Sequence, residues 1–171
     1  DGHLYLFDQV TGAMQYGFQN LTSYGQDKTV YYDNNGQMQY GQQKINGYWY
    51  NFDTFDGAMK TGLVRIPEQN KTVYYNYDGW MLYGWQGIDN VPYYFDTFNG
   101  AMMTGERYIN GHWYLFNDKG QMQRGFQKVM ENGKEKTVYY NYDGWMLYGW
   151  QTINGKRYYF DTFNGALLKE E

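Results

Sequence analysis

Apolar residues along the chain are grouped in short runs. Runs rich in Tyr, Phe, Val and Trp, such as residues 49–52 and 137–140, are bounded by Asn-Gly and Asp-Gly pairs. Aromatic and β-branched side chains favour strands, and these pairs favour tight turns with positive φ. No apolar spacing of helical period persists long enough for a helix. The pattern therefore predicts an all-β chain of β-hairpins, for example residues 149–161 with a turn at Asn154-Gly155.

The hairpins recur as sequence repeats. Residues 71–86 (KTVYYNYDGWMLYGWQ) return unchanged as residues 136–151, and the glycine of a G-x-(M/L) phrase marks eight repeats of about 21 residues. Their predicted bounds are 1–19, 20–43, 44–64, 65–86, 87–107, 108–127, 128–151 and 152–171. One hairpin buries too little surface to be stable alone, so we expect a single repeat domain, residues 1–171, in which hairpins pack on their neighbours.

The longer period predicts how the hairpins are arranged. The unchanged segment returns after three repeats, which fits a superhelix with about three hairpins per turn. Asp1-Gly2 resembles the turn of a repeat already under way, and the final Lys169-Glu170-Glu171 resembles a polar end cap. We therefore expect a C-terminal fragment of a longer protein.

Composition limits the function classes. The 22 Tyr, 10 Phe and 6 Trp make up 22% of the residues, so aromatic rings have to supply both packing and binding. There is no Cys, and therefore no disulfide or thiolate chemistry. No apolar run reaches membrane length, and a net charge of −4 argues against nucleic acid. These features favour an extracellular module that contacts neither membranes nor nucleic acid.

The sequence lacks the motifs of an enzyme. His3 and His112 stand beside hairpin turns, and we interpret both as structural. Most carboxylates occupy repeated turn positions, such as Asp53 and Asp78, where Asp caps its own turn. There is no G-x-S-x-G, HExxH or phosphate-binding loop, and the Asp spacing matches no EF-hand. We predict a non-catalytic chain without a cofactor or metal.

The repeat itself resembles a known family. The pattern G-(W/F)-Q-x-(I/V)-N-G-x-x-Y-x-F-(D/N)-x-x-G-x-M-x-x-G, seen in variants at 84–105, 105–125 and 149–165, is similar to the cell-wall-binding repeats of Gram-positive bacteria and their phages. These include the choline-binding repeats of lysins and the glucan-binding repeats of glucansucrases. The resemblance implies a β-solenoid of stacked hairpins in a left-handed superhelix, with ligand sites between consecutive hairpins. It also implies a cell-wall location and attachment to an extracellular enzyme, in lysins a peptidoglycan hydrolase.

The chain departs from this family at the choline sites. Such sites use two Trp from one hairpin and an aromatic from the next, because a quaternary ammonium needs several aromatic faces. Here no hairpin holds both Trp. The residues that replace the missing partners of Trp49, Trp85, Trp113 and Trp150 are, in that order, Gln42, Pro92, Glu106 and Arg157. The sequence therefore favours a glycan over choline.

A sugar needs less enclosure, because one flat aromatic ring with amide groups beside it makes a weak site. The candidate ligand residues of this kind are Trp85, Gln86, Tyr93, Tyr94, Trp150, Gln151, Tyr158 and Tyr159. Trp49 and Trp113 are further candidates, with packing between hairpins as an equal alternative. Trp80 and Trp145 are included because their position is Ala or Gln in the other repeats. Weak sites repeated along one chain would add by avidity.

Three functions stay open at this point. The first is a targeting module that binds a repeating surface polymer: wall polysaccharide, teichoic acid or peptidoglycan glycan, with choline as a further ligand. The second is a glucan-binding module of a glucansucrase. The third is a spacer or adhesin region whose aromatic residues only pack.

Overall fold

The computed structural model describes residues 2–23 and 25–171 and confirms the all-β prediction. Its strands are β1 Gly17–Ser23, β2 Gln26–Tyr32, β3 Gly41–Ile45, β4 Tyr48–Phe52, β5 Gly62–Ile66, β6 Lys71–Tyr75, β7 Met81–Leu82, β8 Gly84–Ile88, β9 Val91–Phe95, β10 Gly105–Ile109, β11 His112–Phe116, β12 Gly125–Glu131, β13 Lys134–Tyr140, β14 Gly149–Ile153, β15 Lys156–Phe160 and β16 Leu167–Glu170. A 3-10 turn, η1, spans Pro67–Gln69. Over the described ranges, no helix has the length and apolarity of a membrane span.

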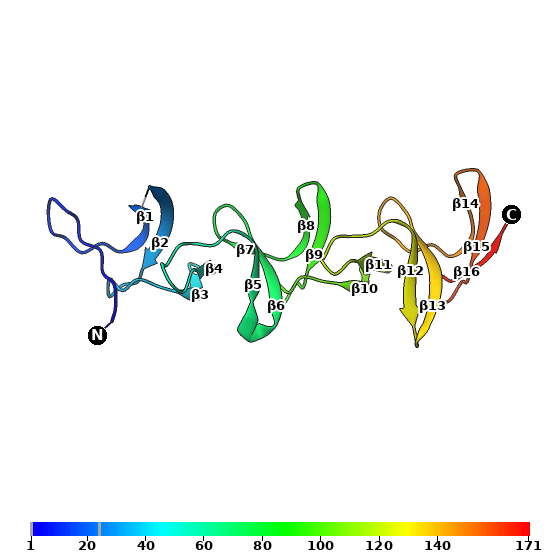
Figure 1. Cartoon of the computed structure of the whole chain (residues 1–171), viewed down its shortest axis with the longest axis horizontal. Coiled ribbons are helices and arrows are strands. Elements are labelled where there is room, and N and C mark those ends of the chain that lie inside the picture. Colours follow the sequence, from blue (N-terminus) through cyan, green and yellow to red (C-terminus); the bar gives the residue numbers. More distant parts are fainter. Residues whose placement is uncertain (1, 24) are drawn as a thin grey trace. The chain divides into compact units, whose positions relative to one another are not determined.

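The strands pair as antiparallel hairpins (Figure 1). Seven pairs are present in the described residues: β1–β2, β3–β4, β5–β6, β8–β9, β10–β11, β12–β13 and β14–β15. β7 and β16 add a short third strand to β6 and β15. In several other repeats the Met of the G-x-M phrase forms one antiparallel bridge to the second strand, as Met122 does with Phe116. In the structure a repeat is thus a hairpin that begins at a glycine, such as Gly84, Gly105 or Gly125, followed by a segment that returns along it, and the word has this sense below.

The predicted Asn-Gly turns have the backbone that such pairs favour. Asn46-Gly47, Asn110-Gly111 and Asn154-Gly155 join β3–β4, β10–β11 and β14–β15 with positive φ at both residues. Two-residue turns of this kind match the right-handed twist of the strands. Between β5 and β6, where the sequence has no Asn-Gly pair, η1 makes the connection and ends at Asn70 with φ 49°.

The G-x-M phrase packs consecutive repeats together. Gly144 has φ 84°, and a Cβ built on it would lie 2.5 Å from Sδ of Met122 in the preceding repeat. Only glycine tolerates both that conformation and that close approach. The backbone N–H of Met146 donates to the carbonyl of Trp113 over 2.9 Å and adds a hydrogen bond between repeats. The glycine and methionine therefore set the spacing from one repeat to the next.

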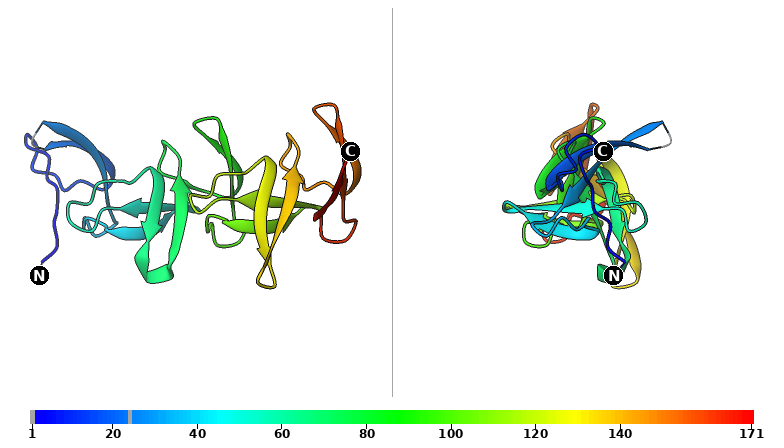
Figure 2. Two further views of the ribbon diagram at one scale, coloured as in Figure 1. Left: turned by 45° about the vertical axis from the view of Figure 1, so that its right-hand side comes forward. Right: turned by 90° about the vertical axis from the view of Figure 1, so that its left-hand side faces the viewer.

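The chain divides into two compact bodies. The N-terminal body comprises the chain up to Tyr83 together with Thr97–Ala101, and the C-terminal body comprises Gly84–Asp96 and Met102–Glu171. Within the C-terminal body, β8–β9 and β14–β15 extend in the same direction and β12–β13 in the opposite one (Figures 1 and 2). The core of each body is a series of small clusters, each built mainly by one hairpin, because a two-stranded ribbon has little surface to bury.

Candidate ligand pocket

Trp85 lies opposite Tyr94 in the β8–β9 hairpin and packs between two consecutive hairpins. Its ring centroid is 5.0 Å from that of Tyr94 and 4.9 Å from that of Tyr114 in the next hairpin, both edge-to-face. Phe126, which also follows a repeat glycine, makes the equivalent contact with Tyr158 at 5.1 Å. The position is therefore one of packing between repeats, and the Trp85 side chain is still 38% exposed.

Trp150 lies opposite Tyr159, and the guanidinium group of Arg157 lies over its ring. The guanidinium carbon of Arg157 is 4.4 Å from the indole centroid. Arg157 stands where the resemblance implied the second Trp of a choline site, so a cation of the protein lies over one face of the indole. Gln151 donates from Nε2 to the backbone carbonyl of Tyr148 over 2.7 Å.

The other strand candidates differ in burial. Tyr93 and Tyr158 are only 6% and 9% exposed, and their rings belong to the core. Tyr94 and Tyr159 are half-buried on the other face of the same strands. Gln86, also half-buried, lies opposite Tyr93. In each hairpin, the more exposed of the two tyrosines is thus the one that lies opposite the tryptophan.

Trp80 and Trp145 connect repeats. The indole of Trp145 donates from Nε1 to the Tyr114 hydroxyl over 2.8 Å and stacks on the His112 ring at 3.8 Å, with the planes 4° apart. The N–H and one face of the indole are therefore engaged within the protein. The equivalent partners of Trp80 are Tyr50, at 2.7 Å, and Tyr48, at 4.2 Å.

Trp113 lines a pocket of about 370 Å³ in the C-terminal body. It is 41% exposed and projects from β11, on the hairpin that also carries Glu106. The pocket is formed by three consecutive repeats, because its wall includes side chains of β12–β13 and of the following turn. The lining residues are Glu106, Trp113, Glu131, Lys136, Met146, Tyr148, Phe163 and Asn164.

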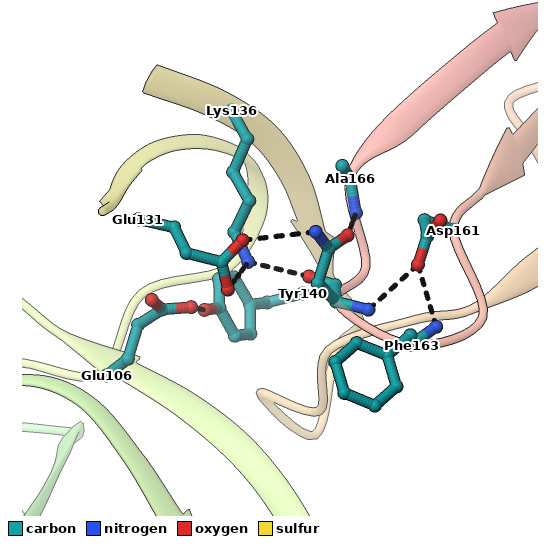
Figure 3. Close-up of polar contacts among 8 residues, drawn as sticks. Glu106, Glu131, Lys136, Tyr140, Asp161, Phe163 and Ala166 are labelled. Atoms are coloured by element: carbon teal, nitrogen blue, oxygen red, sulfur yellow. Dashed lines mark hydrogen bonds and ion pairs between the residues drawn. The ribbon is translucent and has the colours of Figure 1, made fainter. Parts of the chain in front are cut away.

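A polar network surrounds this pocket (Figure 3). Lys136, only 12% exposed, donates from Nζ to the carbonyl of Asn164 over 2.7 Å and forms an ion pair with Glu131 at 3.2 Å. The Asn164 amide donates to the other Glu131 oxygen over 3.1 Å. The mostly buried charge of Lys136 is therefore satisfied by Glu131 of its own hairpin and by the turn of the next repeat together.

Glu106 accepts a hydrogen bond at Oε1 from the Tyr140 hydroxyl over 2.9 Å. Burial raises the pKa of Tyr140 well above its usual range, and the negative charge of Glu106 raises that pKa further. Burial also raises the pKa of Tyr148. Both tyrosines therefore stay protonated at neutral pH, and the pocket contains two carboxylates and one ammonium group beside its aromatic walls.

The N-terminal body contains a matching set one long period earlier. Lys71 donates from Nζ to the carbonyl of Asn99 over 2.7 Å, as Lys136 does to Asn164. Trp49 takes the place of Trp113, and its strand β4 contacts β7. At the position of Glu106 stands Gln42, which donates from Nε2 to the Tyr75 hydroxyl over 2.9 Å.

Sequence reasoning named Trp113 as a candidate and matched it with Glu106, but it did not name the rest of the pocket wall. Glu106, Lys136 and Asn164 come from different repeats, so no local motif joins them. The long period contained a signal, because the KTVYY lysine and the F-N-G turn recur together with constant spacing. Over the described ranges, no group of three or more His, Cys, Asp or Glu side chains could hold a metal ion.

Comparisons with known families agree with the repeat pattern. The family model described as choline-binding repeat matches residues 60–106 and 130–171, together more than half of the chain. The chain belongs to the choline-binding repeat family. A second model, described as putative cell wall binding repeat, matches residues 107–122, which include Trp113. The resemblance predicted from the sequence is thereby confirmed, and the choline-binding repeats extend over both sides of the pocket.

Solved structures of choline-binding proteins are similar to the chain. CbpF in complex with ipratropium shares 27% identity over 99% of this chain and 57% of that chain, with a TM-score of 0.81. Choline binding protein F from Streptococcus pneumoniae, in the presence of a peptidoglycan analogue, shares 28% over 96% and 55%, with a TM-score of 0.77. CbpJ from Streptococcus pneumoniae, 24% identical over 98% and 63% with a TM-score of 0.82, shows likeness of fold alone. The chain spans less than two thirds of each, and no curated protein matches it.

Proposed function

We propose that these choline-binding repeats form a non-catalytic module that holds its parent protein on a repeating polymer of the Gram-positive cell wall. The pocket around Trp113 carries the proposal. It lies between consecutive repeats, and it combines an indole, a phenol and a thioether with the Glu106 carboxylate. Aromatic and soft apolar groups beside a few polar ones suit a small substituent or sugar of such a polymer.

The polymer proposed is a wall polysaccharide, teichoic acid or peptidoglycan glycan. The partly exposed indoles of Trp85 and Trp150, each followed by a Gln, are proposed as additional stacking faces for sugar rings. Weak contacts of this kind add by avidity when several engage one polymer. The parent protein is proposed to be an extracellular lytic enzyme, such as a peptidoglycan hydrolase, at the cell wall.

The architecture proposed for this module is one domain of eight repeats, wound as a left-handed β-solenoid with about three hairpins per turn. The common direction of β8–β9 and β14–β15, three hairpins apart, supports the number per turn. Small-angle X-ray scattering tests it. A compact chain of this length has a radius of gyration of about 16 Å, and a solenoid of narrow hairpins must exceed that value clearly. A value near 16 Å would contradict the solenoid.

Retention on purified Gram-positive cell walls tests the function. The chain should sediment with walls, and the competitor that releases it identifies the ligand class: free choline, wall polysaccharide or dextran. Release by dextran alone would favour the glucan-binding alternative. Failure to sediment with any wall would favour a spacer or adhesin role.

A variant pair tests the pocket itself. Trp113→Ala removes its largest aromatic wall and should weaken retention about tenfold, equivalent to about 1.4 kcal/mol. Tyr77→Ala is the matched control, because Tyr77 is a fully exposed aromatic residue at a turn of the N-terminal body. Equal retention of the two variants, both folded by circular dichroism, would show that the pocket does not bind the polymer.

A further inference from the structure

A lysine, a glutamate and an asparagine meet where β13 contacts the turn that precedes β16 (Figure 3). Lys136 donates from Nζ to Oε1 of Glu131 over 3.2 Å, and Asn164 donates from Nδ2 to Oε2 of the same carboxylate over 3.1 Å. Lys136 Nζ also lies 2.7 Å from the main-chain carbonyl oxygen of Asn164. One carboxylate therefore bridges an amine and a carboxamide that come from consecutive repeats.

The carboxamide of Asn164 is fixed at both of its ends. Its nitrogen is held by Glu131, and its oxygen accepts a hydrogen bond from the backbone N–H of Ala166 over 3.0 Å. A donor at the amide oxygen draws electrons away from Cγ and stabilises negative charge that develops on that oxygen. The Lys136 side chain is only 12% exposed, so little water surrounds its amine. The arrangement brings a nucleophile, a proton acceptor and a polarised amide together.

We propose that Lys136 and Asn164 join in an intramolecular isopeptide bond, with Glu131 as the proton carrier. Glu131 accepts a proton from Nζ at Oε1, and the free amine attacks Cγ of Asn164. The Nζ–Cγ bond forms and the Cγ–Nδ2 bond breaks as Glu131 passes that proton to Nδ2. The second proton lost from Nζ leaves with the released ammonia as an ammonium ion. Nothing is oxidised or reduced, and no co-reactant is needed.

Positioning makes this reaction accessible, and its irreversibility allows it to be slow. Reacting groups that the fold holds side by side behave as if they were present at very high concentration. The ion pair with Glu131 favours the protonated amine, so the free amine is the minor form and the bond should form well after folding. Ammonia diffuses away once it is released, so each molecule has to react only once.

The chain contains two comparison sets at the same 28-residue separation. Lys71 donates to the carbonyl oxygen of Asn99 over 2.7 Å, but among the described residues no carboxylate forms an ion pair with Lys71. Lys28 donates to the carbonyl oxygen of Asp56, whose side chain is a carboxylate instead of a carboxamide. The bridged arrangement belongs to Lys136, so we expect one such bond in each molecule.

The bond would tie the last two repeats together. It joins β13 to the turn between β15 and β16, so the C-terminal hairpin could not separate from the hairpin before it. The inference does not depend on what the neighbouring pocket binds.

Intact mass spectrometry of the full chain tests the inference. After prolonged incubation at mildly alkaline pH, the mass should fall short of the sequence mass by that of one ammonia molecule. Tryptic digestion should then release a branched peptide that joins the segments around Lys136 and Asn164. A full mass throughout, or a mass loss without the branched peptide, would overturn the proposal.

Variants separate this bond from another reaction that releases ammonia. An Asn-Gly pair such as Asn164-Gly165 can also lose ammonia by closing to a succinimide. Lys136→Arg leaves that route open but replaces the amine by a guanidinium that stays charged, so the chain should keep its full mass. Glu131→Gln should also keep the full mass, because an amide does not carry the proton. A loss of ammonia that persists in Lys136→Arg would assign the loss to a succinimide.

Lys71→Arg is the matched control, since it changes the equivalent lysine of the N-terminal body. This variant should lose one ammonia molecule as the unaltered chain does. Circular dichroism checks that every variant is folded, and the branched peptide of the unaltered chain is read without any variant. The mass is measured without cell walls, so a cross-linked chain that no wall retains would support the inference and contradict the targeting function.

Discussion

The glycine of each G-x-M phrase from Gly36 onward lies against a methionine of the preceding repeat. At Gly144 the backbone is left-handed, and a Cβ would also approach Cδ1 of Tyr114 to 3.1 Å. At Gly133 the backbone is left-handed too, with φ 77°, but nothing lies within 4 Å of a built Cβ. These two glycines therefore separate backbone strain from packing.

Gly144→Ala should lower the free energy of unfolding by about 2–4 kcal/mol, because strain and a clash with Met122 act together. Gly133→Ala should cost about 1 kcal/mol through strain alone. Urea denaturation of the two variants and the unaltered chain gives the comparison. Equal losses would mean that Met122 moves away at no cost.

Among the residues that the structure describes, burial raises the pKa of five tyrosines: Tyr32, Tyr75, Tyr83, Tyr140 and Tyr148. Their unfolded pKa is about 10, so above that pH the unfolded chain loses protons that the folded chain keeps. The stabilisation is fully present below about pH 10 and is lost as the pH rises towards the folded values.

The free energy of unfolding should therefore be level from pH 8 to about 10 and fall steeply above. Urea titrations at each pH, with tyrosinate absorbance on the same samples, check this. Tyr140→Phe should make the fall shallower, since that residue has the largest raised pKa. An unchanged slope in that variant would assign the alkaline transition to other groups.

At the scale of elements, side chains carried by one repeat hold the hairpin of the repeat before it. Trp145 stands in the turn after β13 and reaches both His112 and Tyr114 of β11. This contact competes with ligand binding for the indole, since one face and the N–H are already used. A tryptophan at this position is thus a connector between elements.

Trp145→Phe should destabilise the chain by about 1–3 kcal/mol, because the mostly buried Tyr114 loses a hydrogen-bond donor and His112 loses part of its stacking surface. Choline or glycan affinity should stay within about twofold. Thermal unfolding followed by circular dichroism measures the loss of stability. A titration with the competitor that releases the chain from cell walls measures the affinity. A loss of affinity without a loss of stability would identify Trp145 as a ligand residue instead.

For the whole molecule, the related sets around Trp49 and Trp113 predict avidity. If both engage one polymer, the second contact forms at a high effective concentration. Trp49→Ala with Trp113→Ala should then reduce wall retention by more than the sum of the two separate losses. Retention as a function of chain concentration on the same wall preparation tests this, with a soluble monovalent ligand as the reference. A strictly additive result would mean that a single set binds.

The all-β class, the hairpins, their turns and the repeat family can be predicted from the sequence alone. These features depend on neighbouring residues and on a repeat period that is visible in the sequence. Asn154-Gly155 favours a tight turn, and Gly144 favours a left-handed backbone, whatever residues lie elsewhere in the chain. The repeat phrase was sufficient for the wider family of cell-wall-binding repeats because it recurs in register, and the family model then identified the choline-binding repeat.

Which aromatic rings pack and which line a pocket depends on how the repeats pack on one another. Trp85 and Trp113 both stand on hairpin strands, yet Tyr114 of the next repeat packs on the first, whereas the second faces Glu106 and the turn around Asn164. Exposure of a ring depends on what the following repeats place over it, and those residues lie tens of positions away in the chain. The pocket therefore exists only once three repeats have packed together, which no local pattern specifies.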